Sequence, residues 1–263
     1  MASLPHETIS LPTGDRLGFV RVAGTEPGLL VVGGYGKSAL EKPIGPIALQ
    51  YALQRQRACI VLEFRSQGRS SPLAQGMSVP GMRDDILAAA EALGLENCLG
   101  IGASLGAWAL LAAQQRRNRL LWGMLALAPA IDWDLTYFKP LSARGGLAAD
   151  GNGHIHVPAS GIVVSRDFFN DLDACRIKAG VLGLKGPHHI IHGTDDVVAP
   201  IARSEQFAAE SGAKLIRLPG AGHEVSALQS AAAQQAFVLE CDAMLATRAT
   251  LAADRGPGHP DAE

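Results

Sequence analysis

The sequence lacks the features that mark membrane proteins and nucleic-acid-binding proteins. Its 263 residues contain no apolar run of about eighteen residues, the length that a transmembrane helix needs, so we expect no membrane span. Lysine and arginine number 23 against 25 aspartates and glutamates, and the formal net charge is -2. Because a phosphate backbone is bound through a basic surface, we expect no nucleic-acid partner.

Cysteines are few, and no targeting segment is visible. Cys59, Cys98, Cys175 and Cys241 show no C-x-x-C spacing, which predicts free, buried thiols and neither disulfides nor metal ligands. The first seven residues, MASLPHE, lack the charged and then apolar pattern of a secretion signal, so we expect a cytoplasmic protein. We expect no cofactor and no metal.

What the chain does contain is an alternation of strand-like and helix-like segments. Short runs rich in valine, isoleucine and leucine predict strands at 17–22, 29–32, 59–64, 98–101, 123–127, 190–191 and 214–218. Apolar residues at three- and four-residue spacing predict helices at 39–55, 81–93, 105–115, 201–211 and 225–247. This alternation predicts one α/β domain, residues 1–263, with a mostly parallel sheet that is covered by helices on both faces.

One long segment interrupts the alternation. Residues 130–187 exceed the length of about fifteen residues beyond which a connection usually has a role of its own, so we predict a cap over a binding pocket. Five aromatic residues of this segment are candidates for the pocket lining: Trp133, Tyr137, Phe138, Phe168 and Phe169. The alternative is a small satellite core that touches no substrate.

The cap and the C-terminus also carry turn-forming residues. Glycines predict turns at 145–146, 151–153 and 160–161, and the segments 154–157 and 162–165 are expected to pair as a short hairpin. Residues 252–263 are polar and contain two prolines, which predicts a flexible tail.

The pentapeptide GASLG at residues 102–106 carries the first chemical signal. It stands between a predicted strand and a predicted helix, with Ser104 at its centre. A serine nucleophile needs a sharp strand-to-helix turn that projects its hydroxyl from the sheet, and small flanking residues allow such a turn. Because G-x-S-x-G also arises by chance in a glycine-rich chain, the assignment depends on its context.

The context supplies a carboxylate and a histidine. After the strand at 190–191 comes the turn HGTDDVVAP (192–200), which places Asp195 and Asp196 at the edge of the sheet where α/β proteins bind ligands. After the next strand comes a glycine-rich loop with one histidine, His223. A histidine oriented by a carboxylate is the usual base that removes the proton of an attacking serine.

Three other histidines, His188, His189 and His192, lie close together in the sequence. Because a strand directs alternate side chains to opposite faces, and the first two lie at its buried start, we assign them to packing and not to a metal site.

Together these motifs resemble the nucleophile elbow, acid turn and histidine loop of the α/β-hydrolase superfamily. The similarity spans about residues 29 to 245. Residues 33–36, 64–70 and 104–108 are most similar to the single-domain carboxylesterase and palmitoyl-protein thioesterase branch. Ser66 stands where that branch usually carries a glycine.

The resemblance implies an α/β-hydrolase fold and assigns roles to five residues. Ser104 would be the nucleophile, His223 the base, and Asp196 the acid, since the pattern H-G-T-x-D-x-V-x-P aligns with Asp196. Two backbone amides would form the oxyanion hole that stabilises the charge of the tetrahedral intermediate. Leu105 follows the nucleophile directly, and Tyr35 would supply the second amide from the glycine-rich loop.

These residues predict acyl transfer to water. A serine at the elbow argues against dehalogenase and epoxide-hydrolase chemistry, which uses an aspartate there. We predict hydrolysis of a small-molecule carboxylic ester or thioester through an acyl-serine, with an apolar acyl group under the cap. A C–C bond hydrolase or an acyltransferase would use the same triad, and a ligand-binding receptor with vestigial turnover would use the same scaffold. A monomer or homodimer is expected.

Overall fold

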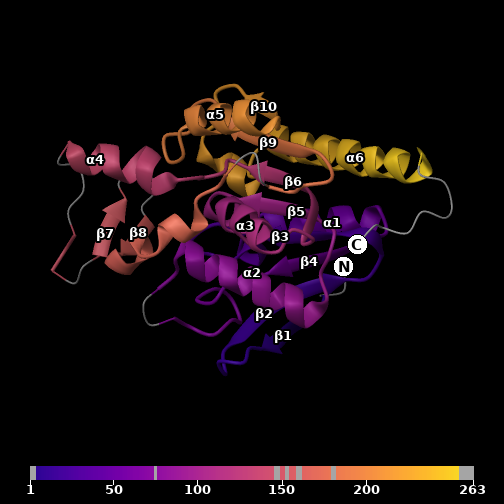
Figure 1. Cartoon of the computed structure of the whole chain (residues 1–263), viewed down its shortest axis with the longest axis horizontal. Coiled ribbons are helices and arrows are strands. Elements are labelled where there is room, and N and C mark those ends of the chain that lie inside the picture. Colours follow the sequence, from indigo (N-terminus) through magenta and orange to yellow (C-terminus); the bar gives the residue numbers. More distant parts are fainter. Residues whose placement is uncertain are drawn as a thin grey trace.

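The computed structural model describes residues 4–73, 76–144, 149–151, 154–157, 162–178 and 182–254. Its centre is an eight-stranded sheet with the order β1-β2-β4-β3-β5-β6-β9-β10 (Figure 1). The strands from β4 to β10 run parallel, and the pairs β1–β2 and β2–β4 are antiparallel. The bounds are β1 His6–Ser10, β2 Arg16–Val22, β3 Thr25–Val32, β4 Arg57–Leu62, β5 Cys98–Ala103, β6 Leu121–Leu127, β9 His188–Gly193 and β10 Lys214–Leu218.

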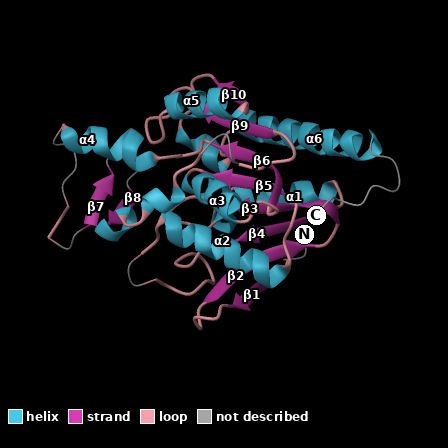
Figure 2. Cartoon of the chain, in the orientation of Figure 1, coloured by secondary structure: helices cyan, strands magenta, loops and turns pink. Residues whose placement is uncertain are grey.

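Helices cover both faces of this sheet, as Figure 2 shows. Along β3, Leu30 and Val32 belong to one apolar cluster, and Leu29 and Val31 belong to the other, because successive strand residues face opposite sides. The first cluster includes residues of α2 (Val79–Leu93), α3 (Leu105–Arg116) and α5 (Ile201–Ser211), and the second includes residues of α1 (Ile44–Gln54) and α6 (Ala231–Asp254). This arrangement confirms the predicted α/β class.

The strand order reverses around β3. The connection from β3 through α1 leads to β4 on one side of β3, and the connection from β4 through α2 returns to β5 on its other side. In open α/β sheets, ligands bind at the carboxyl ends of the strands where the order reverses in this way. Residues that directly follow β3 and β5 therefore occupy the expected position for a site.

Two predicted helices are each split in the structure. Residues 39–55 form a short 3₁₀ turn, Ala39–Glu41, followed by α1, and Pro43 lies just before α1, where a missing N–H costs least. Residues 225–247 form a 3₁₀ turn, His223–Ala227, that ends at Leu228 with φ +56°, followed by α6. The apolar spacing did not reveal the second break because Val225 and Leu228 are buried in the same cluster as α6.

Strand β1 was not predicted, since it is half-exposed and contains few apolar residues.

The segment between β6 and β9 forms a separate group of short elements, on the left in Figure 1. It contains a π-helical turn (Asp134–Phe138), α4 (Lys139–Ala143), the hairpin strands β7 (His154–Val157) and β8 (Ile162–Ser165), and 3₁₀ turns at Arg166–Phe169 and Leu172–Cys175. The antiparallel pairing of β7 with β8 confirms the predicted hairpin. We call residues 130–187 the cap.

Several predicted features fall outside the described residues. The turns expected at 145–146, 152–153 and 160–161 are among them, as are residues 255–263 of the predicted tail. Residues 252–254 belong to the last turn of α6. Within the described part of the chain, no helix combines the length and the hydropathy that crossing a bilayer requires.

Candidate active site

Ser104 lies on a tight turn between β5 and α3. Its backbone has φ +52° and ψ −124°, a conformation that residues other than glycine rarely adopt. A Cβ atom at position 102 would stand 2.6 Å from Cα of Ala107, and one at position 106 would overlap the carbonyl oxygen of Gly33. Glycine is therefore required on both sides of the turn, which presents the Ser104 hydroxyl at the carboxyl end of β5.

His223 connects Ser104 to Asp196 through hydrogen bonds. Its Nδ1 lies 2.7 Å from Oδ2 of Asp196, and its Nε2 lies 3.0 Å from Oγ of Ser104. A carboxylate only accepts hydrogen bonds, so Nδ1 carries the proton and Nε2 is free to accept from the hydroxyl. The structure thus brings together three predicted residues that follow three different strands, β5, β9 and β10.

Asp196 is held firmly in its turn. The side chain is buried, with 5% of its surface exposed, and Oδ1 accepts from the amides of Val198 and Ala199 at 2.9 and 2.8 Å. Burial by itself raises the pKa of Asp196, but hydrogen bonds from His192 and His223 outweigh it and hold the pKa well below its usual range. Asp195 is exposed, and its side chain accepts from the hydroxyl of Thr194.

His192 is a second imidazole on the same carboxylate. Its Nε2 lies 3.2 Å from Oδ2 of Asp196 and 2.8 Å from the carbonyl oxygen of Ala199, so this nitrogen carries a proton. Its Nδ1 accepts from the hydroxyl of Ser204 at 2.8 Å. The expected role of His192 was packing alone. Its spacing of four residues from Asp196 was the signal that could have revealed the contact.

The other two clustered histidines are structural. His188 is buried against Phe207, neither of its ring nitrogens has a hydrogen-bond partner among the described residues, and burial lowers its pKa to about 4. His189 lies 2.7 Å from Oε2 of Glu240. In the part of the chain that the structure describes, no group of three or more His, Cys, Asp or Glu residues is placed to hold a metal ion. The four cysteines are buried and free, in agreement with their predicted state.

The loop after β3 passes directly beside the nucleophile. A Cβ atom on Gly34 would stand 3.0 Å from Cβ of Ser104. The amides of Tyr35 and Leu105 donate no hydrogen bond to any described residue. Leu105 is the first residue of α3, where backbone amides have no partner within the helix. Both amides are therefore available to a ligand atom near Ser104.

A cavity of about 60 Å³ adjoins Ser104, Tyr35 and His223. It is also lined by residues that the sequence analysis did not single out, among them Lys42, Ile44 and Ile162. Burial lowers the pKa of Lys42. These residues belong to no motif and come from two distant parts of the chain, so no local pattern could have identified them.

The five predicted pocket aromatics form a cluster inside the cap. Trp133 and Phe168 are almost fully buried, and the rings of Trp133 and Phe138 are 4.6 Å apart. Phe138 and Phe169 border a separate cavity of about 630 Å³. None of the five is among the described residues that line the Ser104 cavity. The five side chains pack against one another and belong to, or pack against, the apolar cluster that includes residues of α2 and α3, so their role as substrate-pocket lining stays a prediction.

Ion pairs stabilise the cap, and hydrogen bonds connect it to the loops around Ser104. Arg176 contacts Asp134 through two hydrogen bonds of 2.7 and 2.6 Å, and Asp132 at 3.1 Å. Trp133 donates to the carbonyl oxygen of Val198 in the acid turn at 2.6 Å, and the Tyr35 hydroxyl donates to the carbonyl oxygen of Val163 at 3.2 Å.

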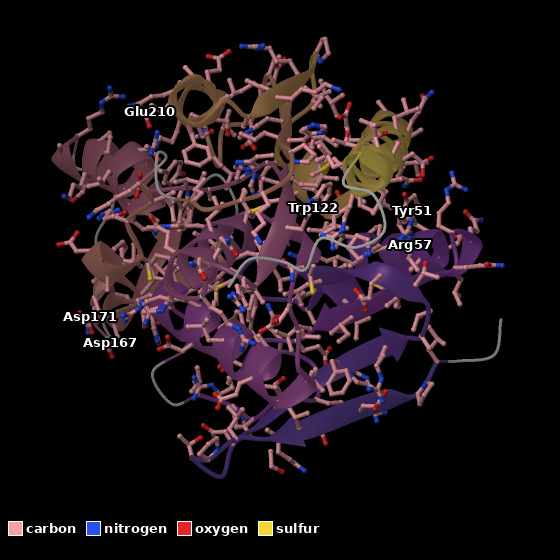
Figure 3. The ribbon with its side chains drawn as sticks, turned by 45° about the vertical axis from the view of Figure 1, so that its right-hand side comes forward. Tyr51, Arg57, Trp122, Asp167, Asp171 and Glu210 are labelled. Atoms are coloured by element: carbon pink, nitrogen blue, oxygen red, sulfur yellow. The ribbon has the colours of Figure 1, made fainter. Side chains whose placement is uncertain are left out.

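The position of the cap is visible in Figure 3. Asp167 and Asp171 of the cap lie on the opposite side of the molecule from Arg57, at the amino end of β4. The cap therefore lies toward the carboxyl ends of the parallel strands.

The sheet, its helices and the turn around Ser104 define the α/β-hydrolase fold, and comparison with solved structures supports this assignment. Mouse alpha/beta hydrolase domain-containing protein 10 superposes with a TM-score of 0.79 at 17% identity, covering 92% of this chain and 99% of that one. A putative hydrolase from Agrobacterium vitis S4 gives a TM-score of 0.78 at 18% identity, with coverage of 92% and 99%.

A sequence relative agrees with the predicted resemblance. The human mitochondrial palmitoyl-protein thioesterase ABHD10 is 23% identical over 208 residues, which is 76% of this chain and 67% of that protein. No family model matches the chain.

Proposed function

We propose that the protein is a serine hydrolase that cleaves a carboxylic ester or thioester through an acyl-Ser104 intermediate. The observation that carries the proposal is the unbroken series of hydrogen bonds from the Ser104 hydroxyl through His223 to Asp196. The similarity to a thioesterase and to hydrolases of the same fold supports hydrolase chemistry. The free amides beside Ser104 support an acyl-transfer mechanism.

In the proposed reaction, the Ser104 oxygen attacks the acyl carbon while Nε2 of His223 takes the hydroxyl proton. Asp196 accepts from Nδ1 and stabilises the imidazolium that forms. The oxyanion receives hydrogen bonds from the amides of Tyr35 and Leu105. The C–O or C–S bond to the leaving group breaks as His223 returns the proton to it. Water, deprotonated by His223, then attacks the acyl-serine and releases the carboxylic acid and the free serine.

The substrate is a small ester or thioester with an apolar acyl group. Ile44 and Ile162, beside Ser104, are suited to an apolar chain. The cytoplasmic location and a monomeric or homodimeric state stay predictions.

The proposal is tested with the purified protein and three substrate series: p-nitrophenyl esters of increasing chain length, acyl-coenzyme A esters and S-acyl peptides. We expect turnover of at least one series and labelling of Ser104 by a fluorophosphonate probe. Ser104→Ala should abolish the labelling and lower kcat by at least about 10⁴-fold. Ser211→Ala, which removes a hydroxyl that bonds within α5, is the matched control and should leave both unchanged. No turnover of any series together with an unlabelled Ser104 would disprove the proposal.

Product analysis tests the alternative reactions. Recovery of the acyl group on an added alcohol, and not as the free acid, would indicate an acyltransferase. A turnover number below about one per second together with slow product release would indicate a receptor.

A further inference from the structure

The peptide group between Gly34 and Tyr35 carries one of the two amides assigned to the oxyanion hole. This bond is trans, since Glu26–Pro27 is the one cis peptide among the described residues. In a trans peptide group, the carbonyl and the N–H point in opposite directions. Any contact that fixes the direction of the Gly34 carbonyl therefore also fixes the direction of the Tyr35 N–H.

The contact that fixes this carbonyl comes from Gln67. Its Nε2 donates to the carbonyl oxygen of Gly34 at 2.9 Å and, at 3.4 Å, to that of Lys37. Its Oε1 accepts from the amide of Phe64 at 3.2 Å. The nitrogen thus faces only acceptors and the oxygen faces a donor, so the orientation of the carboxamide is defined. Only 3% of Gln67 is exposed, which leaves its side chain no alternative partner in water.

The turn after β4 is shaped to hold Gln67 in this place. Ser66 and Gly68, on either side of it, both have positive φ, at +73° and +45°. The amide of Gln67 donates to the carbonyl oxygen of Phe64, and its own carbonyl accepts from the amide of Ser70, each at 2.9 Å. A Cβ atom on Gly68 would overlap the carboxylate of Glu63, so the turn does not tolerate a side chain there. This backbone directs the Gln67 side chain into the protein.

Gln67 contacts the Gly34–Tyr35 peptide through the Gly34 carbonyl, and Ser104 lies beside the same peptide at the cavity. Gly34, Tyr35 and Ser104 border the cavity next to the nucleophile, and Gln67 does not. We propose that Gln67 is a positioning residue: its hydrogen bond to the Gly34 carbonyl orients the shared peptide group so that the Tyr35 N–H points into the Ser104 cavity, toward the oxyanion. This inference rests on the proposed function, because an oxyanion forms only if acyl transfer takes place.

The test replaces Gln67 by methionine, which is similarly long and unbranched but has no donor. Loss of one oxyanion donor lowers kcat by about 10²- to 10³-fold, and since misorientation is a partial loss we expect a decrease of about 10- to 100-fold with KM nearly unchanged. Affinity for a trifluoromethyl ketone, which forms an oxyanion with the serine, should fall by the same factor as kcat. Affinity for the matching unreactive amide should not change. Gln67→Leu, which also has no donor, is the second variant and should show the same pattern if Gln67→Met does not fold.

Gln114 provides a matched control for a purely structural effect. It is also a fully buried glutamine that bridges backbone groups, donating to the carbonyl oxygens of Asn118 and Leu182 and accepting from the amide of Leu121. Gln114→Met should lower the melting temperature as much as Gln67→Met does, but leave kcat and ketone affinity unchanged. Two results would overturn the inference about Gln67 but not the proposed function. One is an equal loss of kcat in Gln67→Met and Gln114→Met, and the other is a folded Gln67 variant whose kcat is within threefold of wild type. An inactive wild-type protein with an unlabelled Ser104 would overturn the proposed function, and this inference with it.

Discussion

The loops around Ser104 and the cap lie against each other, but different interactions hold them in place. Around Ser104, buried hydrogen bonds fix each group on a turn that directly follows a strand of the central sheet. In the cap, short elements pack through aromatic rings and through the ion pairs of Arg176. We therefore expect substitutions near Ser104 to lower kcat more than they lower the free energy of unfolding. Substitutions in the cap should lower the free energy of unfolding more than kcat.

The largest effect is expected from the acid. Asp196→Asn should lower kcat by about 10⁴-fold, because an amide that donates to His223 favours the wrong tautomer of the imidazole. Asp195→Asn is the matched control, since Asp195 is exposed and does not touch His223. Steady-state kinetics with the best ester substrate measures both. A large loss in Asp195→Asn and none in Asp196→Asn would show that the acid has been misassigned.

The cap side of the comparison is tested at Arg176. Arg176→Met should lower the free energy of unfolding by about 3 kcal/mol, because it leaves the largely buried carboxylates of Asp132 and Asp134 without this partner. We expect kcat to stay within about tenfold of wild type, since Arg176 does not border the Ser104 cavity. Urea unfolding and kinetics on the same samples separate the two effects. A variant of unchanged stability but with kcat reduced a hundredfold would contradict the proposed division.

Acid sensitivity should arise in the sheet and not in the cap hairpin. Burial lowers the pKa of His188 from 6.5 to about 4, so between these values the unfolded chain binds a proton that the folded protein does not. Stability therefore falls as the pH decreases from about 6.5 to 4, by about 3 kcal/mol in total. His189, whose pKa burial also lowers, acts in the same direction, whereas Asp196 contributes only below about pH 4.

Two variants measure this contribution. His188→Leu should flatten the pH dependence of the free energy of unfolding between pH 6.5 and 4, as measured by urea denaturation. His154→Gln, which changes an exposed histidine of the cap hairpin, should leave it as in wild type. An unchanged slope in His188→Leu would refute the assignment.

The smallest effect is expected at Ser66, in the turn that holds Gln67. Ser66 has φ +73°, which costs about 1 kcal/mol in a residue other than glycine. Its hydroxyl accepts from the exposed amide of Leu73 at 2.8 Å. Ser66→Gly should raise the free energy of unfolding by up to about 1 kcal/mol, since the relief of strain exceeds the loss of an exposed hydrogen bond. Ser66→Ala loses the bond and keeps the strain, so it should be less stable than wild type by calorimetry; the reverse order would contradict this account.

Local patterns along the chain were sufficient to predict the α/β class, the seven strands and the candidate groups near Ser104. This was possible because each of these features depends on residues that are close together in the chain. Apolar runs make strands, glycines on both sides of Ser104 permit its turn, and the resemblance of residues 192–200 to the family pattern selects Asp196 over Asp195. Strand β1 and the breaks before α1 and α6 were missed because their signals are weak over a few residues.

Contacts between side chains of distant segments became visible only in the folded protein. The contacts of Lys42 with the Ser104 cavity and of Gln67 with Gly34 both depend on how separate loops pack together. The same is true of the cap, where Trp133 and Phe138 pack against Phe168 and Phe169, about thirty residues further along the chain. Local patterns report backbone preference and burial, whereas these contacts are set by the packing of distant segments, which no local pattern encodes.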